Sequence, residues 1–292
     1  MAERDGYPTG VPCWVDTEQV DPDAALAFYG GLFGWEFEER MPAGAPDRYA
    51  VATVQGKAVA GIGSRSDGDG GVAMPTWNTY IWVDSADEAA ARARQAGGTI
   101  LLAPEDVFDA GRTAVFADPT GAAIRVWEAG RHRGAQLVND PGTWVFSELN
   151  TRDLDTPRAF YNKVFGWEAS TVDLAGSETT MWRRPGYGDY LVQLNPPGWR
   201  EALDEFGAPE GFADAVGWMN DMKTGPFPAD VPPHWSITFS VDDTDAAVER
   251  VVKLGGRVIV EPFDAPPVRM AVVADPQGTV FTVSCFDATM SA

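Results

Sequence analysis

Few residues of this chain belong to a motif with recognisable chemistry. There are two histidines, His132 and His234, and two cysteines, Cys13 and Cys285, all in separate parts of the sequence. The sequence contains no CxxC pair, HExxH, glycine-rich phosphate loop or Ser/His/Asp arrangement. We therefore look for functional side chains on strands, where residues two apart share a face and can converge on one cavity.

The first half of the chain predicts a cavity lined with aromatic rings. Ile81 and Val83 form one face of a strand and alternate with polar and aromatic residues on the other. An apolar cleft with a few placed polar groups is typical of a small-molecule site, although the same rings can fill a closed core. An unpaired buried charge is costly, so we expect Arg125 and Asp16 to pair. The residues assigned to this cavity are Trp14, Asp16, Asn78, Tyr80, Trp82, Arg125 and Trp127.

The second half predicts a larger and more polar cavity, because its inward positions carry small hydroxyl groups. If only one half binds a ligand, volume favours the second half and ring stacking favours the first. Glu148 and Asp16 are candidate acids or bases. His234 is a third catalytic candidate, or an ordinary residue at a strand end. The residues assigned to the second cavity are Phe146, Glu148, Ser236, Thr238, Thr282 and Ser284.

The elements that must position these residues occur twice. FYGGLFGW at 28–35 returns as FYNKVFGW at 160–167, and ADPTG at 117–121 returns as ADPQG at 274–278. A Val-Asp pair that precedes a helical stretch ending in Gly-Gly also recurs. Acidic or Pro residues at helix starts, glycines at helix ends and Asp-Pro-x-Gly turns predict two βαβββ units in each copy.

The repeat divides the chain into two α+β domains. We expect a first domain at 8–130, a linker at 131–142 and a second domain at 143–288. The second copy carries extra residues, which we place at about 196–233, a stretch rich in Pro, Gly, Trp and Phe. This insert forms either a lid over a pocket or a loop packed on the outside.

Composition limits the partners. With 22 Lys and Arg against 43 Asp and Glu, the formal charge is −21, which disfavours nucleic acid and anionic membranes and favours neutral or cationic small molecules. No apolar run is long enough to span a bilayer, and the N-terminus lacks the apolar core of a signal peptide. With only two cysteines, this suggests a cytoplasmic protein. Tandem copies make a monomer plausible, and a homodimer remains open.

In the order and spacing of these blocks, the chain resembles the vicinal-oxygen-chelate superfamily, the glyoxalase/bleomycin-resistance/dioxygenase group. The resemblance covers nearly the whole chain. It implies that each pair of βαβββ units forms an open, barrel-like mixed sheet around a cavity, so that four units make two tandem domains. Fold alone does not fix function.

The resemblance also implies a divalent metal held by His, Glu or Gln on the cavity strands. The equivalent first-strand positions are Trp14 and Phe146, and the fourth-strand position lies near 58–60 or at Gln193. The fifth-strand and last-strand positions are Asn78, Ser236, Arg125 and Thr282. Few of these side chains are usual ligands for a transition metal, so we expect neither a metal nor another cofactor.

Three functions remain open at this point. The first is a metal-independent binder of an aromatic or cationic natural product, such as a sequestering antibiotic-resistance protein. The second is an enzyme, a lyase, isomerase or dioxygenase acting on a small carbonyl or phenolic compound. The third is a structural or interaction protein with filled cavities.

Overall fold

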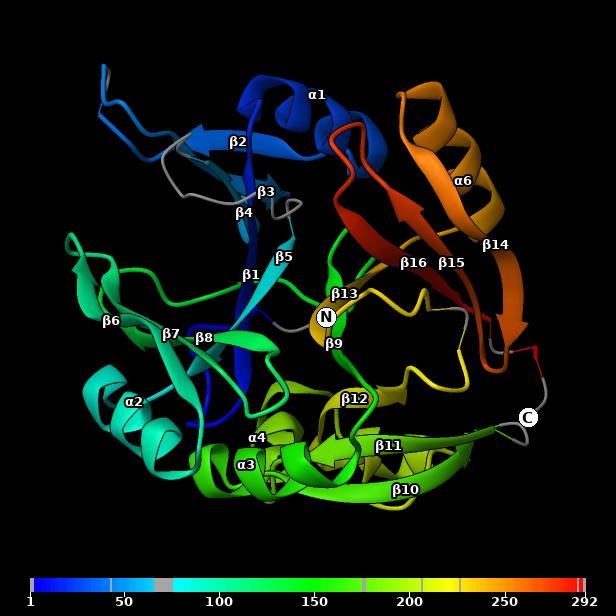
Figure 1. Cartoon of the computed structure of the whole chain (residues 1–292). Coiled ribbons are helices and arrows are strands. Elements are labelled where there is room, and N and C mark those ends of the chain that lie inside the picture. Colours follow the sequence, from blue (N-terminus) through cyan, green and yellow to red (C-terminus); the bar gives the residue numbers. More distant parts are fainter. Residues whose placement is uncertain are drawn as a thin grey trace.

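The computed structural model describes residues 3–42, 44–65, 76–174, 177–205, 207–225, 227–287 and 289–290. Over these residues the chain forms two eight-stranded mixed sheets, one in each half, with strand orders β2-β3-β4-β1-β5-β8-β7-β6 and β10-β11-β12-β9-β13-β16-β15-β14. Each sheet curls into an open barrel (Figure 1). This confirms the predicted α+β class and the paired βαβββ units.

The strands of the first barrel follow the chain from the first unit to the second. They are β1 (Pro12–Gln19), β2 (Glu36–Glu39), β3 (Tyr49–Val54), β4 (Lys57–Ser64), β5 (Trp77–Trp82), β6 (Thr99–Val107), β7 (Gly111–Ala117) and β8 (Ala123–Ala129). The helices of these two units are α1 (Pro22–Phe33) and α2 (Ala86–Gln95).

The second barrel repeats this order. Its strands are β9 (Trp144–Thr151), β10 (Glu168–Leu174), β11 (Ser177–Arg183), β12 (Ala215–Asp221), β13 (His234–Ser240), β14 (Arg257–Ala265), β15 (Val268–Ala274) and β16 (Val280–Phe286). The repeated helices are α3 (Asp155–Phe165) and α6 (Thr244–Lys253).

The extra residues of the second copy lie between β11 and β12. They form α4 (Tyr187–Leu194), α5 (Trp199–Glu205) and the short 3₁₀ helix η1 (Phe212–Asp214). In the first barrel the corresponding strands β3 and β4 are joined by the two-residue turn Gln55-Gly56. The insert therefore occupies about 184–214 rather than 196–233, and residues 215–221 are a barrel strand.

Side chains and glycines set the ends of the repeated helices. The Asp21 carboxylate accepts from the Ala24 N–H at the start of α1, and Gly34 ends α1 with φ of 72°. Ser85 and Asp243 cap α2 and α6 in the same way. These are the ends that the repeat predicts.

The helices pair across the domain boundary. Figure 1 shows α1 beside α6, and α2 beside α3. Phe33 of α1 lies 4.8 Å from Phe239 of β13, and Phe160 of α3 lies 6.1 Å from Phe116 of β7, measured between ring centroids. Each domain thus buries the outer face of its sheet partly against a helix of the other domain.

Two aspartates fix this arrangement. Asp118 uses Oδ1 to accept from the Thr120 N–H inside its own turn, and uses Oδ2 to accept from the Tyr161 hydroxyl of the other domain at 3.0 Å. Asp275 does the same with its own turn and with Tyr29. The repeated Phe-Tyr and Asp-Pro-x-Gly sequences are therefore the two halves of an interdomain contact.

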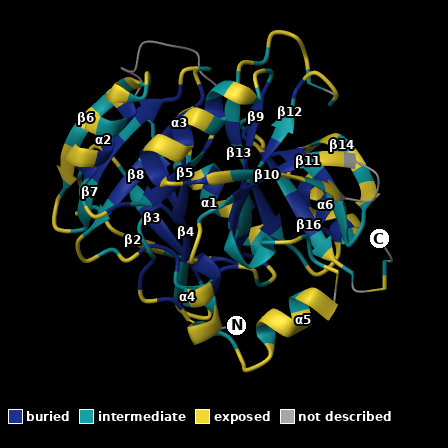
Figure 2. Ribbon diagram, turned by 90° about the horizontal axis from the view of Figure 1, so that it is seen from below, coloured by how far each residue is buried: buried dark blue, intermediate teal, exposed yellow. Residues whose placement is uncertain are grey.

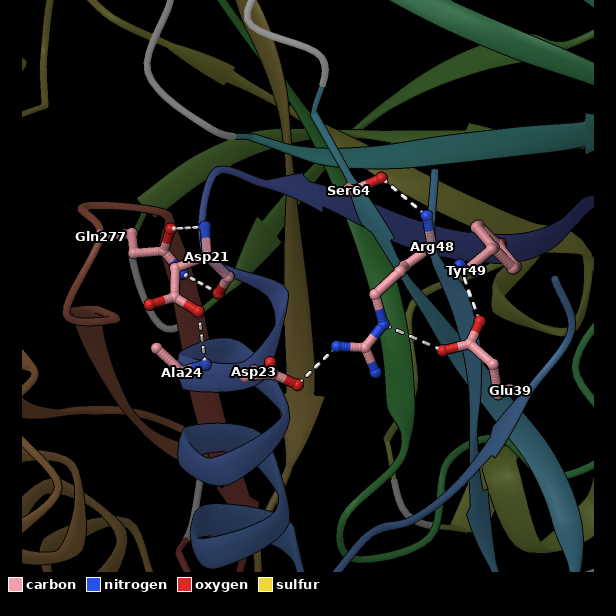
Figure 3. A network of polar contacts seen from close by, with 8 residues as sticks. All are labelled: Asp21, Asp23, Ala24, Glu39, Arg48, Tyr49, Ser64 and Gln277. Atoms are coloured by element: carbon pink, nitrogen blue, oxygen red, sulfur yellow. Dashed lines mark hydrogen bonds and ion pairs between the residues drawn. The ribbon is translucent and has the colours of Figure 1, made fainter. Parts of the chain in front are cut away.

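The contact between Asp275 and α1 is the larger of the two. The Gln19 amide also donates to Asp275 Oδ2, at 3.1 Å. Figure 3 shows the Gln277 amide bonding to both the backbone N–H and the backbone C=O of Asp21, at 2.8 Å each. In the same view Arg48 joins Asp23 of α1 to Glu39 of β2. The start of α1 is held by both domains.

No helix within the described residues is long and apolar enough to cross a bilayer.

Replacing Tyr161 with Phe should destabilise the chain by about 1–3 kcal/mol, because Asp118 Oδ2 loses its donor and the Trp235 indole N–H loses its acceptor. Tyr29→Phe should cost less, because Asp275 Oδ2 keeps its bond from Gln19. Urea unfolding of both variants checks this. A Tyr161→Phe protein as stable as the parent, or a larger loss in Tyr29→Phe, would contradict the assignment.

Candidate functional site

Asp16 occupies the centre of the first barrel and is enclosed by donors. Its Oδ2 accepts from the hydroxyls of Tyr80 at 2.7 Å and Tyr49 at 3.1 Å, and its Oδ1 accepts from the Asn78 amide at 2.9 Å. Burial, followed by the Asp16 carboxylate itself, raises the pKa of both tyrosines well above the ordinary value, so both stay protonated. The structure brings the predicted Asp16, Asn78 and Tyr80 together, and their polar groups form hydrogen bonds to one another.

Tyr49 packs closely inside the first barrel, next to Asp16. Its hydroxyl also accepts from the Trp14 indole N–H at 2.9 Å. Its ring lies across Gly61 of β4, where a Cβ would come within 2.2 Å of the Tyr49 oxygen. Gly61 therefore leaves room for Tyr49, which the sequence analysis did not assign to the cavity.

Arg125 does not pair directly with Asp16. Its Nη2 donates to Glu18 at 2.7 Å, and its Nη1 donates to the Tyr80 hydroxyl at 3.2 Å. The register explains the difference, because β8 places Arg125 opposite Tyr80, whereas Asp16 lies opposite Asn78. The expected ion pair is replaced by a link through the Tyr80 hydroxyl.

The linker closes the first barrel. The His132 ring stands edge-on to Trp14 at 4.3 Å, and its backbone carbonyl accepts from the Trp127 indole N–H at 2.9 Å. Burial, with a smaller effect of Arg40, lowers the pKa of His132 to about 4. Trp82 lies at the barrel edge, beside Tyr7 and under the Arg133 guanidinium. Nothing in the spacing of His132 indicated that the linker returns to the barrel.

Glu148 occupies the position of Asp16 in the second barrel, and its surroundings are less complete. Its Oε1 accepts from the Thr238 hydroxyl at 2.6 Å, and its Oε2 has a longer contact with the Ser236 hydroxyl at 3.3 Å. Burial raises the pKa of Glu148 to about 8, an effect that the two hydroxyls only partly offset. The three residues were predicted to share the cavity, and the structure brings them into contact.

Three aromatic side chains form a cluster at this end of the second barrel. Phe146 of β9 lies 6.2 Å from Phe212 of η1 and 5.8 Å from Trp218 of β12. Trp218 pairs with Glu148 across the β9–β12 ladder. All three rings are only partly buried. Phe212 was not predicted, and Trp218 was considered only as part of an insert that could form a lid, because both lie inside the predicted insert.

Of the remaining predicted residues, two share the face of Glu148 and two lie elsewhere. Thr282 lies opposite Thr238, and Ser284 opposite Ser240, on the same face as Glu148. His234 stands at the start of β13, where its ring faces Phe227 and its Nδ1 lies 2.9 Å from the Pro232 carbonyl. Gln193 is exposed on α4 and does not supply a barrel strand position.

The donor sets do not fit a divalent metal. Within the part of the chain that the structure describes, no group of three or more His, Cys, Asp or Glu side chains is placed to hold an ion. The centre of each barrel offers one carboxyl among phenol, amide and guanidinium groups in the first and hydroxyl and aromatic groups in the second. Transition metals require several His, Cys or carboxylate donors, so we derive no chemistry from a metal here.

Two hollows of the surface lie outside the barrels. One, of about 390 Å³, lies at the start of α3 and includes Arg152, Arg158 and Lys223 in its lining. The other, of about 290 Å³, lies among α4, α5 and η1 and includes Phe212 in its wall. The second hollow therefore adjoins the aromatic cluster of the second barrel.

Comparison with known proteins identifies the family. Residues 19–126 match the model of the Glyoxalase/Bleomycin resistance protein/Dioxygenase superfamily, and residues 144–284 match that of a glyoxalase-like domain. CFP32 of Mycobacterium tuberculosis, provisionally named a glyoxylase, is 38% identical over 97% of this chain and 97% of its own length. The anthracycline biosynthesis protein DauV of Streptomyces sp. strain C5 is 33% identical over 95% of this chain and 94% of its own.

Solved structures share the fold. The Mn(II)-bound glyoxalase from Novosphingobium aromaticivorans has a TM-score of 0.58 at 16% identity, covering 100% of this chain and 87% of its own. A catechol 2,3-dioxygenase has a TM-score of 0.56 at 12% identity, covering 96% of this chain and 88% of its own. With the sequence relatives and the two barrels, these matches show that the chain belongs to the glyoxalase/bleomycin resistance/dioxygenase superfamily, with one tandem domain in each half.

Proposed function

We propose that the second domain binds a small, flat, neutral aromatic molecule inside its barrel, without a metal and with the Glu148 carboxyl as the polar anchor. The observation that carries this proposal is the contrast between the two central carboxyls. Asp16 is closed in by three donors, the hydroxyls of Tyr80 and Tyr49 and the Asn78 amide. Glu148 has two hydroxyl contacts, and Phe146 and Trp218 on the same side of the sheet are partly exposed.

The protonation of Glu148 suits an uncharged ligand. With a pKa of about 8, its carboxyl is mostly neutral at neutral pH. A neutral carboxyl both donates and accepts hydrogen bonds, so it can bind a carbonyl or a hydroxyl of the ligand. The hydroxyl groups of Thr282 and Ser284 on the same face offer further contacts.

The rings favour a flat molecule. Phe146, Phe212 and Trp218 meet at centroid distances of 5.8 to 6.3 Å and keep part of their surface accessible. Each ring that stacks on an aromatic ligand contributes about 0.5–1.5 kcal/mol beyond the apolar area that it buries. The likeness to DauV supports this ligand class, because anthracyclines are flat polycyclic compounds. A chain of net charge −21 would repel an anionic ligand.

A second candidate function is metal-independent acid–base catalysis on a carbonyl compound. Glu148 favours it, because a carboxyl with a pKa of about 8 can give and take a proton near neutral pH. Replacing Glu148 with Gln separates the two functions, because a binder would lose affinity whereas an enzyme would lose turnover by far more than affinity.

Trp218→Phe and Phe146→Ala should weaken binding of a neutral aromatic compound, and Phe146→Ala should do so by about tenfold through the lost ring contact and buried area. Isothermal titration calorimetry against a panel of such compounds measures this. Trp127→Phe, in the first barrel, is the matched control and should leave affinity unchanged. A panel without any binder, or an equal loss in the control, would refute the proposal.

The unfolding free energy should fall as pH rises from about 4.5 to about 8, because folded Glu148 keeps a proton that the unfolded chain releases. Within this window the contribution of Glu148 approaches about 1.4 kcal/mol per pH unit. Urea unfolding across this pH range should therefore show that the unfolding free energy of Glu148→Gln falls less steeply with pH than that of the parent protein. Glu201→Gln, on the exposed surface of α5, is the control and should keep the parent slope. An identical pH dependence in parent and Glu148→Gln would show that Glu148 is ionised when folded.

A further inference from the structure

We infer that the ligand enters the second barrel through the hollow beneath α5, and that Phe212 is the gate between this entrance chamber and the barrel. The inference rests on the proposed binding function, because it concerns access to that same site. It gives a role to the insert between β11 and β12, which the first barrel replaces with a two-residue turn.

One aromatic ring belongs both to the hollow and to the aromatic cluster of the second barrel. Phe212 belongs to the wall of the 290 Å³ hollow. The same ring lies 6.2 Å from Phe146 and 6.3 Å from Trp218, at the end of the barrel where β9 and β12 begin. Turning Phe212 away from these two rings would join the hollow to the space beside Glu148.

Helix α4, on one side of this chamber, is firmly held. Tyr187 and Gly188 of α4 are buried, and the Tyr187 hydroxyl accepts from the buried Arg4 guanidinium at 2.5 Å. The Asp214 carboxylate accepts from the Gly188 N–H at 2.7 Å and so ties the end of η1 to α4. The N-terminal segment therefore anchors α4 and leaves it little freedom to move.

Helix α5, on the other side of the chamber, is weakly held. α5 has no buried residue among those described, and it stands apart from the sheets in Figure 2. The ion pair that links it to α4 joins Arg200 and Asp189 at 3.0 Å, with both side chains largely exposed. Gly211, just before Phe212, has φ of 78°, a conformation that favours glycine and permits a sharp turn between α5 and η1. An exposed ion pair and a glycine before Phe212 both lower the cost of moving this segment, as a gate at Phe212 requires.

The hollow of about 390 Å³ lies at the opposite end of the barrel, and its lining is mostly charged, so it suits a neutral aromatic ligand less well than the hollow beside Phe212. There Phe227 lies against His234. The Arg152 guanidinium, just after β9, donates to the carbonyls of Val231 and Pro228 at 2.7 and 2.8 Å and ties that loop to the end of the strand. In addition, the filled first barrel has only the Gln55-Gly56 turn where the second has its chamber. The chamber thus accompanies the more open of the two barrels.

A cysteine reporter inside the barrel tests the gate without any natural ligand. Ser284→Cys, in a Cys285→Ser background where the remaining Cys13 is buried, places one thiol on the cavity face. Its rate of reaction with dithiodipyridine, a neutral aromatic disulfide, reports access to the barrel. Adding Phe212→Ala should raise that rate about tenfold, the effect expected from removing two ring contacts. Adding Arg200→Ala should raise it about twofold to fivefold.

Phe227→Ala is the matched control, because it removes a phenylalanine at the other end of the barrel and should leave the rate unchanged. Circular dichroism and thermal unfolding establish that each variant is folded. If Phe227→Ala raised the reaction rate and Phe212→Ala did not, the entrance would lie at the other end of the barrel and the inference would be overturned. Equal rates in all variants would also overturn it. Because no ligand is involved, either result leaves the binding proposal to be judged by calorimetry.

Discussion

The interdomain tyrosine–aspartate hydrogen bonds are the constraint on which the structure depends. A barrel-like sheet buries its outer face only if helices cover it, and in this chain part of that cover comes from the other domain. Tyr161 and Tyr29 fix the helices α3 and α1 on the turns of Asp118 and Asp275. Since the outer faces are stabilised in this way, the interior of each barrel is free to differ.

The two interiors differ through a few side chains at equivalent positions. Asp16 is shorter than Glu148 by one methylene group and is met by phenol and amide donors, with Tyr49 filling the space in front of Gly61. Around Glu148 the equivalent strands carry Ser236, Thr238 and Trp218. One scaffold thus holds an enclosed, hydrogen-bonded carboxylate in its first copy and a partly exposed aromatic cluster near a less enclosed carboxyl in its second.

Much of this structure was predictable from local patterns. The repeated blocks predicted the four units, and the capping residues and glycines predicted the ends of α1, α2 and α6. Strand alternation also predicted that Glu148, Ser236 and Thr238 share one face, because side-chain parity is a local property.

The missed features depend on long-range packing. Tyr49 and His132 reach the first barrel from a strand and a linker whose sequences show no sign of it. The predicted pairing of Arg125 with Asp16 failed because the β5–β8 register decides which residues face each other. Neither Trp218 nor Phe212 was assigned to the cavity strands, because a stretch rich in Gly, Pro and Trp gave no sign of strand β12 or of η1 before it. The pairing of β12 with β9 and β11 reveals the strand.

In the proposed function the second barrel, and not the first, takes the ligand. Fluorine NMR of protein carrying fluorotryptophan distinguishes the two barrels, with the signals of Trp218 and Trp127 assigned through their Phe variants. Titration with a neutral aromatic compound that binds should shift the Trp218 signal and leave that of Trp127 in place. A shift of Trp127 alone, or of neither residue on addition of a proven binder, would contradict the account.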